Sequence, residues 1–453
     1  MFKIMSSLLN TACVMSVIAY FLTRTQFYSN ILEKKKSRRQ QALLVAVFGL
    51  FSLYGAFNAI PFYGGLVSLR PTGPILGGLI GGPWVGLGVG LIGGIDRFLQ
   101  GGASVWSATL ATVLAGLFAG LYAAWRKKDD LVSVTEAVSF TVFYEMFASG
   151  LTFLFLADFA KALAIEQGIR LPLIIGNAIA VATFIFITKN LIAERKNQET
   201  KKRIESELQV ARNIQMSMVP KIFPAFPNIK ELDIYAYLSP AKEVGGDLYD
   251  FFFIDDDHFC FLIGDVSGKG VPASLFMAVT KTLIRAKARP GIGSEELLFK
   301  TNSELCRGNE ETMFVTMFCA ILNIKTGEVT YSNGGHNPPY LHRADGSLNA
   351  IPCTPGVALG ILDDFSYDQQ ELRLEPGDRL VIYTDGVTEA QAVNEEQFTT
   401  LRLEQAIQKC PSSGARTVVN EIVEAVETFS NGAEQFDDIT ILVLEYRGTA
   451  DEA

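Results

Sequence analysis

Five long apolar segments in the first 190 residues constrain this chain more than any other feature of its sequence. A helix needs about 20 apolar residues to cross the hydrocarbon core of a bilayer, so segments of this length predict membrane-spanning helices. The first segment is too long, and too closely followed by others, to be a cleaved signal peptide. We therefore predict a multi-spanning membrane domain over residues 1–190, with spans near 5–24, 42–62, 103–124, 134–157 and 171–190.

The segment PTGPILGGLIGGPWVGLGVGLIGG, residues 71–94, is also apolar but is crowded with glycine and proline. It forms either a sixth span packed through its small residues or a re-entrant, broken element inside the bundle. Basic clusters at 34–39, at 126–128 and after Lys189 bear on this choice, because basic loops favour the cytoplasmic side. Five spans with a re-entrant element place all three clusters inside and the N-terminus outside. We favour this topology over six spans.

The composition changes from apolar to charged near residue 192, and residues 191–222 form a predicted helical linker. Within it, apolar residues recur at steps of four and three, which is the a/d pattern of a short coiled coil. Fewer than three heptads need support from a partner helix or a domain surface. The stripe therefore predicts either a homodimer contact that carries motion from the membrane domain or a helix lying on its own domain. Its members are Ile204, Leu208, Ala211, Gln215 and Met218.

Short strand-like segments dominate residues 230–447, with helical segments between them. Short runs rich in β-branched and aromatic residues, bounded by turn residues, are typical of antiparallel strands. Their succession predicts an α+β fold, an antiparallel β-sandwich flanked by helices. The predicted strands are 233–239, 258–266, 316–324, 328–335, 338–343, 378–385 and 438–446, and the predicted helices are 271–289, 294–306, 401–409 and 414–428.

Charge and cysteine usage argue against two classes of site. The net charge of −9 argues against a nucleic-acid partner, because phosphate contacts need clustered Lys and Arg. The six cysteines are scattered without a CxxC pair, and the chain has only three histidines. The sequence therefore shows no zinc motif and suits a reducing compartment.

Acidic residues stand at the ends of the predicted strands: Asp247, Asp265, Asp385 and the pair Asp437–Asp438. Each borders apolar strand residues, so its carboxylate is costly there unless it is solvated or paired. Oxygen ligands without nearby His or Cys favour Mg²⁺ or Mn²⁺. A single aspartate of this kind is most simply a turn or cap residue. Four such strand ends together predict a metal site.

The stretch FLIGDVSGKGVPASLF around Asp265 also looks like a nucleotide-binding loop. A Walker A loop needs four residues between its two glycines and a hydroxyl residue after the lysine. Here three residues separate Gly264 from Gly268, and Gly270 follows Lys269. We therefore interpret the Gly-Lys-Gly turn as backbone that lets Asp265 reach a metal.

Two parts of the chain resemble known families. Residues 58–102, which contain RPTGPILGGLIGGPWVGLGVG, and LIIGNAIAV at 173–181 resemble the LytS-type five-transmembrane sensor module. The motifs AKEVGGDLYDFF, IGDVSGKGVPASLFM, YSNGGHNPPYL, LVIYTDGVTEA and FDDITILVL resemble the PPM-type metal-dependent serine/threonine protein phosphatases, in particular the SpoIIE/RsbU branch. The second resemblance runs from about residue 205 to 447 and includes the expected motifs in order.

The phosphatase resemblance implies two Mg²⁺ or Mn²⁺ ions and direct hydrolysis by an activated water, with no phosphoenzyme. It implies that Asp265 bridges both ions and that Asp265 and Asp247 are the catalytic carboxylates. The implied metal ligands are Asp247, Asp265, the carbonyl of Val266, Asp385 and Asp437, with Asp438 beside them.

Several positions of the phosphatase half need separate interpretation. Ser267 stands where eukaryotic relatives carry a His that is a candidate acid for the leaving group. Lys242 stands where they carry a phosphate-binding Arg, so Lys242 and Lys269 are candidates for binding substrate phosphate, with plain surface solvation as the alternative for Lys242. His336 in GGHNPPY is better interpreted as shaping a turn than as a general acid.

The membrane resemblance implies that residues 1–190 sense an unknown small ligand or a state of the bilayer. Arg70 and Arg97 flank the glycine-rich segment, and a charge there either has a function in the bundle or snorkels to the headgroups. The chain departs from the family at Ser68–Leu69, where relatives tend to carry Asn-Thr, so the identity of the ligand stays open.

Together these features predict a receptor phosphatase in a bacterial inner (plasma) membrane, with its phosphatase domain in the cytoplasm. Its predicted partner is a phosphorylated regulatory protein, and the resemblance implies a STAS-type anti-sigma-factor antagonist. One alternative is a catalytically weak signalling protein that acts by binding a partner. The other is a transporter or channel gated by its soluble domain.

Overall fold

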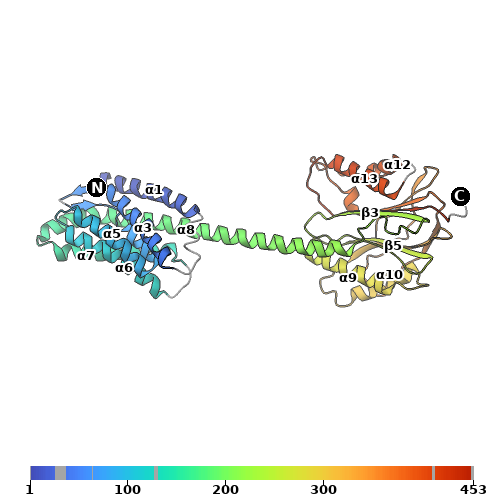
Figure 1. Ribbon diagram of the computed structural model, residues 1–453, viewed down its shortest axis with the longest axis horizontal. Coiled ribbons are helices and arrows are strands. Elements are labelled where there is room, and N and C mark those ends of the chain that lie inside the picture. Colours follow the sequence, from blue (N-terminus) through green and yellow to red (C-terminus); the bar gives the residue numbers. More distant parts are fainter. Residues whose placement is uncertain (1, 26–36, 64, 127–130, 411–413, 450–453) are drawn as a thin grey trace. The chain divides into compact units, whose positions relative to one another are not determined.

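The computed structural model describes all residues except 1, 26–36, 64, 127–130, 411–413 and 450–453 (Figure 1). Its contacts divide the chain into two compact units, Met1–Lys202 and Arg203–Ala453, which are described separately here. The basic clusters at 34–39 and 126–128 lie largely outside the described residues.

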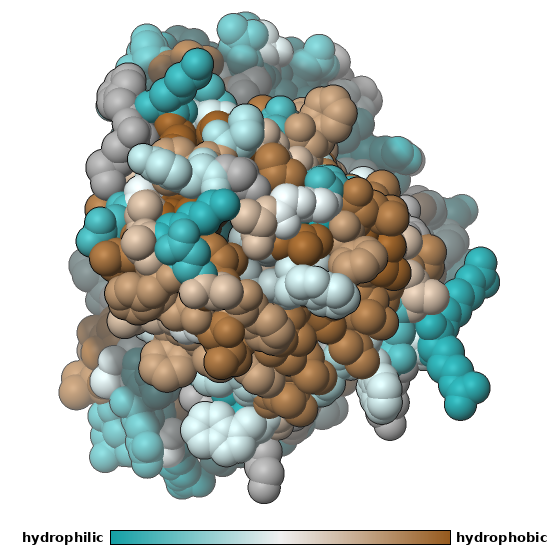
Figure 2. Space-filling model, turned by 90° about the vertical axis from the view of Figure 1, so that its left-hand side faces the viewer, coloured by the Kyte–Doolittle hydropathy of each residue, from teal (hydrophilic) through white to brown (hydrophobic). Residues whose placement is uncertain are grey.

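Five helices of the N-terminal unit are long and apolar enough to cross a membrane. Large apolar side chains such as Phe57 and Trp125 stand exposed on their outer surfaces, and Figure 2 shows hydrophobic side chains gathered over a broad area of this unit. A water-soluble unit would bury such a surface, so a multi-pass membrane protein is confirmed by helix length and composition. The five helices are α1 (Phe2–Arg24), α3 (Arg38–Phe57), α6 (Val105–Trp125), α7 (Val134–Phe155) and α8 (Phe159–Met218).

The glycine-rich segment forms two helices, α4 (Thr72–Gly81) and α5 (Pro83–Leu99), in place of one span. The break is at Gly82, whose φ of 86° favours glycine. Glycines also bring α5 into backbone contact with α6, since a Cβ on Gly86 would lie 2.0 Å from the carbonyl oxygen of Gly116. In the structure this segment is thus a broken element inside the bundle. A short hairpin, β1 (Ile60–Phe62) and β2 (Gly65–Val67), precedes it.

Helix α8 is continuous over 60 residues and ends within the C-terminal unit. Its final turns lie on that unit, because Gln215 is buried and Met216 packs against the hydrophobic core. The end of this helix therefore agrees with the second alternative for the predicted stripe, which is a helix lying on its own domain.

The C-terminal unit contains two five-stranded antiparallel sheets, in the orders β10-β7-β6-β5-β4 and β3-β12-β11-β8-β9. The strands are β3 (Leu232–Ser239), β4 (Leu248–Phe253), β5 (His258–Val266), β6 (Val315–Asn323), β7 (Glu328–Gly334), β8 (Tyr340–His342), β9 (Leu348–Ala350), β10 (Gln370–Arg373), β11 (Arg379–Tyr383) and β12 (Ile439–Tyr446).

Helices cover both sheets (Figure 1). Alternate residues of β12 face two cores, as strand geometry requires. Leu442 and Leu444 belong to the core shared with the first sheet, whereas Ile441 and Val443 belong to the core beneath α12 and α13. The predicted α+β sandwich flanked by helices is confirmed. Its helices are α9 (Val271–Lys287), α10 (Ser294–Cys306), the short α11 (Asp385–Thr388), α12 (Thr399–Gln408) and α13 (Ala415–Ser430).

Candidate active site

Strands from both sheets end at one edge of the sandwich and bring the predicted aspartates together. Asp247 directly precedes β4, Asp265 is the penultimate residue of β5, Asp385 begins α11, and Asp437–Asp438 precede β12. The carboxyl groups of Asp247 and Asp265 lie close enough to interact, and Asp265 also interacts electrostatically with Asp385 and Asp437. Residues separated by up to 191 positions in sequence thus form one acidic cluster.

Two threonines of the second sheet hold Asp247, which belongs to the first. Thr384 Oγ1 donates a hydrogen bond to Asp247 Oδ2 at 2.8 Å, and Thr440 Oγ1 donates to the same oxygen at 2.5 Å. The N–H of Thr440 in turn donates to Thr384 Oγ1 at 3.0 Å. Sequence reasoning missed both threonines. The available signal was a hydroxyl residue beside each acidic motif, in YTD and in DDIT.

Asp438 is bonded to backbone and faces the turn that carries Asp247. Its Oδ1 accepts from the N–H of Ala241 at 2.8 Å, and its Oδ2 accepts from those of Gly246 at 2.6 Å and Asp247 at 3.3 Å. A Cβ on Gly245 would lie 2.0 Å from Asp438 Oδ2, so glycine is needed for this approach. Because its oxygens are engaged by amides, Asp438 fits a residue beside the metal ligands better than a ligand itself.

Burial and mutual repulsion raise the pKa of the clustered carboxyl groups. Burial, followed by the charges of Asp385 and Asp437, raises the pKa of Asp265 to about 7. Burial and then the charges of Asp265 and Asp438 raise the pKa of Asp247 well above its usual range. The pKa of Asp385 is also raised, by burial and by Asp437. The site therefore has an excess of negative charge that a bound cation would relieve.

One lysine lies at the edge of this cluster. Lys269 Nζ is 3.0 Å from Asp437 Oδ2, donates to the carbonyl oxygen of Phe436 at 2.7 Å, and lies 4.1 Å from the centre of the Phe436 ring. Lys242 is exposed on the loop before Asp247, and its side chain makes no hydrogen bond or ion pair with the described residues. Both candidate phosphate-binding lysines thus lie on loops that border the acidic edge.

The donors at this edge fit hard divalent cations. A Cβ on Gly246 would lie 2.8 Å from the carbonyl oxygen of Val266, so the absence of a side chain there keeps that oxygen accessible. Across the described parts of the chain, no three Asp, Glu, His or Cys side chains are gathered closely enough to enclose one ion. Pairs of carboxylates completed by a backbone carbonyl, water and substrate oxygen are usual for Mg²⁺. The residues present therefore fit Mg²⁺ or Mn²⁺.

His336 connects the two sheets close to the acidic edge. Its Nδ1 lies 2.9 Å from Thr316 Oγ1 and its Nε2 lies 3.1 Å from the carbonyl oxygen of Tyr383, which can only accept. Thr316 pairs with Asp265 across β5 and β6, and Tyr383 ends β11 just before Asp385. Burial lowers the pKa of His336 to about 4, so the ring is neutral. These contacts support the interpretation that His336 shapes the site.

Comparison with known proteins supports the resemblance of both halves. Residues 255–447 match the family described as Stage II sporulation protein E (SpoIIE), and residues 25–191 match the family described as 5TMR of 5TMR-LYT. Phosphoserine phosphatase RsbU of Bacillus subtilis is 32% identical over 242 residues, which cover 53% of this chain and 70% of RsbU.

Protein IcfG of Synechocystis is 28% identical over 366 residues, which cover 74% of this chain but only 54% of IcfG, so the match spans about half of that relative. The solved SiaA-PP2C domain of Pseudomonas aeruginosa aligns with a TM-score of 0.49 and 20% identity, over 55% of this chain and 98% of that domain. From the match to most of RsbU and to both family models, the chain belongs to the SpoIIE/RsbU family of PP2C-type phosphatases and carries an N-terminal 5TMR-LYT membrane module.

Proposed function

We propose that this chain is a membrane-anchored receptor phosphatase that hydrolyses phosphoserine or phosphothreonine on a cytoplasmic regulatory protein. The observation that carries the proposal is the aspartate cluster, in which carboxylates from both sheets meet at one edge beside Lys269. The relative that is named phosphoserine phosphatase RsbU supports a phosphate ester as the bond that this chain hydrolyses. The family resemblance favours a STAS-type anti-sigma-factor antagonist as the substrate.

Two Mg²⁺ or Mn²⁺ ions fit this edge. When bound, the ions activate water for in-line attack and neutralise charge on the phosphate. Asp247, Asp265, the carbonyl of Val266, Asp385 and Asp437 are the groups that would hold these ions.

The chain's own residues act by holding these ligands in place. Thr384 and Thr440 both donate hydrogen bonds to Oδ2 of Asp247, which fixes the orientation of the carboxylate. Asp438 aligns the turn that carries Asp247 through three backbone amides. Lys269 supplies a positive charge at the rim, where a phosphate dianion arrives.

The test uses the full-length protein in lipid nanodiscs with a phosphoserine protein as substrate. We expect phosphate release in MgCl₂ or MnCl₂ that chelation with EDTA abolishes, and a loss on the order of 10³-fold or more in Asp385→Asn. Asp255→Asn is the matched control, because Asp255 lies in a surface turn where it bonds His258. If folded protein releases no phosphate from several phosphoproteins with either ion, the partner-binding alternative is favoured. Ligand-dependent flux in liposomes would instead favour a transporter.

We also propose that α8 carries the signal to the active site. Gln215 Nε2 donates to the carbonyl oxygen of Gly245 at 2.7 Å, and the N–H of Gly245 donates to Gln215 Oε1 at 3.2 Å. Gly245 precedes Gly246 and Asp247, so a shift of the helix end displaces the turn that positions this ligand. This two-bond contact supports control of catalysis by the membrane domain.

Gln215→Leu tests this route. We expect a change of about 10-fold or more in kcat and the loss of any response to the membrane domain, because the carboxylate is repositioned. Gln209→Leu is the control on the same helix, since Gln209 is exposed and bonds only Asn213. Equal effects of Gln215→Leu and Gln209→Leu on kcat would contradict signal transfer through the Gln215–Gly245 contact.

The proposal places the N-terminal unit in a bacterial inner membrane and the phosphatase unit in the cytoplasm. A second copy would pair along the first part of the predicted stripe, at the exposed Ile204 and the half-buried Leu208, because Gln215 is already engaged by its own unit. Cysteine cross-linking at Ile204 in nanodiscs tests this homodimer, and a monomer at all protein concentrations would contradict it.

A further inference from the structure

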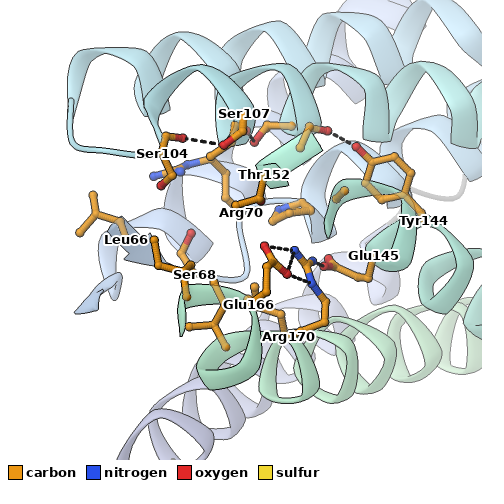
Figure 3. Close-up of a pocket in the computed structure, with 18 residues that line it drawn as sticks. Leu66, Ser68, Arg70, Ser104, Ser107, Tyr144, Glu145, Thr152, Glu166 and Arg170 are labelled. Carbon is orange, nitrogen blue, oxygen red and sulfur yellow. Dashed lines mark hydrogen bonds and ion pairs between the residues drawn. The ribbon is translucent and has the colours of Figure 1, made fainter. Parts of the chain in front are cut away.

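A cavity of about 90 Å³ lies inside the N-terminal unit, between the loop before α4 and helices α6, α7 and α8 (Figure 3). Arg70 lies on one side, and Glu145, Glu166 and Arg170 lie on the other. This volume admits roughly six to nine water-sized groups, which is the size of a small polar metabolite.

One side of the cavity carries an excess negative charge. Arg170 Nη1 donates to Glu145 Oε2 at 2.8 Å, and Arg170 Nε and Nη2 donate to the two oxygens of Glu166 at 2.7 and 2.8 Å. The other partners, Asn177 and Ser149, are neutral. Two carboxylates therefore share one guanidinium, and both glutamates are buried.

The opposite side carries an excess positive charge. Arg70 Nε pairs with Asp96 at 3.2 Å and its Nη2 donates to Gln100 at 2.6 Å. The neighbouring Arg97 is fully buried and bonds Ser104 and a backbone carbonyl, and its Nε has no partner in the described part of the chain. Arg97 does not itself line the cavity and makes no ion pair with a described residue, so the two neighbouring guanidinium groups have one carboxylate beside them, that of Asp96, which pairs with Arg70 alone. Both arginines turn into the unit, so they do not snorkel outward.

Two buried hydroxyl groups in the cavity wall are free to bind a ligand. Ser68 and Thr152 are only 7% and 8% exposed, both line the cavity, and neither side chain hydrogen-bonds to any described residue. No ion pair among the described residues joins the two charged sides across the cavity. The two hydroxyl groups are not among the fully enclosed side-chain atoms that lack a partner, so they are open to the cavity and can hydrogen-bond to an occupant.

We propose that this cavity binds a small zwitterion, such as a short amino acid. Its ammonium group lies against Glu145 and Glu166, its carboxylate against Arg70, and Ser68 and Thr152 hydrogen-bond to it. The reason is electrostatic: opposite excess charges face each other inside an apolar bundle, where uncompensated charge is costly. A simple anion neutralises only one side and a simple amine only the other. A ligand with both charges neutralises both.

A ligand bound in the cavity would contact α8 directly, because Glu166 and Arg170 belong to that helix. It would also contact the loop before α4, which carries Arg70. The regulatory consequence rests on the proposed phosphatase function, whereas the binding itself does not. Binding is therefore measured separately from activity.

The test is calorimetry on the full-length protein in nanodiscs with glycine, L-alanine and β-alanine, against propionate and ethylamine as single-charge fragments. We expect at least one amino acid to bind tenfold or more tightly than either fragment. Glu166→Gln should weaken amino-acid binding at least tenfold without weakening propionate. Ser68→Ala, a conservative change, should weaken it several-fold and keep the fold. Tryptophan fluorescence checks folding, because Trp84, Trp106 and Trp125 all lie in this unit.

Three outcomes would overturn the inference: propionate binding as tightly as every amino acid, ethylamine doing so, or folded protein binding none of the probes. Amino-acid binding that leaves phosphatase activity unchanged would uphold the site and contradict control by the membrane domain. A protein that binds an amino acid but releases no phosphate at all would contradict the proposed function and uphold the site.

Discussion

Both halves of this chain bury carboxylates, but they compensate the charge to different degrees. In the membrane unit, Glu145 and Glu166 share Arg170, and each of their four oxygens accepts a hydrogen bond. At the phosphatase edge, Lys269 is the one lysine among the described residues that forms an ion pair with the aspartate cluster. One positive charge is missing from the first region and several from the second. The difference fits the ammonium group that we propose for the first region and the divalent ions that we propose for the second.

Asp250 sharpens the comparison, because it lies three residues from Asp247 in the same motif. Asp250 contacts Lys281 and accepts from Arg285 Nε at 2.5 Å and Nη2 at 2.8 Å, so its charge is fully compensated. Two acids in one short motif thus have different roles, and the balance of charge around each one distinguishes them.

The largest effect is expected from a pair of isosteric changes at these acids. Asp265→Asn should lower phosphatase activity on the order of 10³-fold or more, while ion-free protein unfolds at the same or higher denaturant concentration because repulsion is relieved. Asp250→Asn should instead destabilise the unit by about 3–5 kcal/mol, because Lys281 is left without its partner. Activity assays and urea unfolding followed by circular dichroism measure both. Equal changes in activity and in stability for Asp265→Asn and Asp250→Asn would refute the distinction between an uncompensated and a compensated carboxylate.

A comparable loss of stability is expected in the membrane unit. Arg170→Gln leaves Glu145 and Glu166 uncompensated and should destabilise the unit by about 3–5 kcal/mol. Tryptophan fluorescence reports on this unit alone, since all three tryptophans lie in it. Lys161→Gln, at an exposed position of the same helix and the same unit, should stay within about 0.5 kcal/mol. An equal response of the two variants would mean that burial of the cluster does not matter.

The next effect concerns His336, a buried histidine close to the aspartate cluster of the phosphatase unit. The pKa of His336 is about 4 in the folded protein, so below its usual pKa of 6.5 the unfolded chain binds a proton that the folded chain rejects. Stability should therefore fall by up to about 3 kcal/mol as pH decreases from 6.5 to 4. Urea unfolding across this range measures the slope. His336→Gln should flatten it, and a slope that His336→Gln leaves unchanged would contradict the assignment to this residue.

The smallest effect is expected from the hydroxyl groups that hold Asp247. Thr440→Val removes one of the two bonds to its Oδ2 and should weaken Mn²⁺ activation about 10- to 100-fold, measured as the metal concentration for half-maximal rate. Thr280→Val is the control, because Thr280 is equally buried but bonds only a carbonyl of its own helix. If both variants respond alike, general packing and not ligand orientation explains the result.

Much of the secondary structure could be predicted from local patterns. The bounds of β5 and α10 agree with the predicted 258–266 and 294–306. Strand β4 was missed because Asp250 interrupts the apolar run Leu248–Phe253 and looks like a turn residue until α9 supplies its counter-charge. The short strands β9 and β10 were missed because three or four partly exposed residues carry little periodicity.

The sequence by itself determined the membrane half, the α+β sandwich and the identity of the clustered aspartates, because hydrophobic length, strand periodicity and acidic turns are local properties. Only the tertiary structure decided which groups surround each charge. It placed Thr384 and Thr440 on Asp247, engaged Asp438 with backbone amides, paired Asp250 with α9, and set Arg70 opposite Glu166 across a cavity. The reason is physical: the free energy of a buried charge depends on neighbours that are distant in sequence, and no local pattern encodes them.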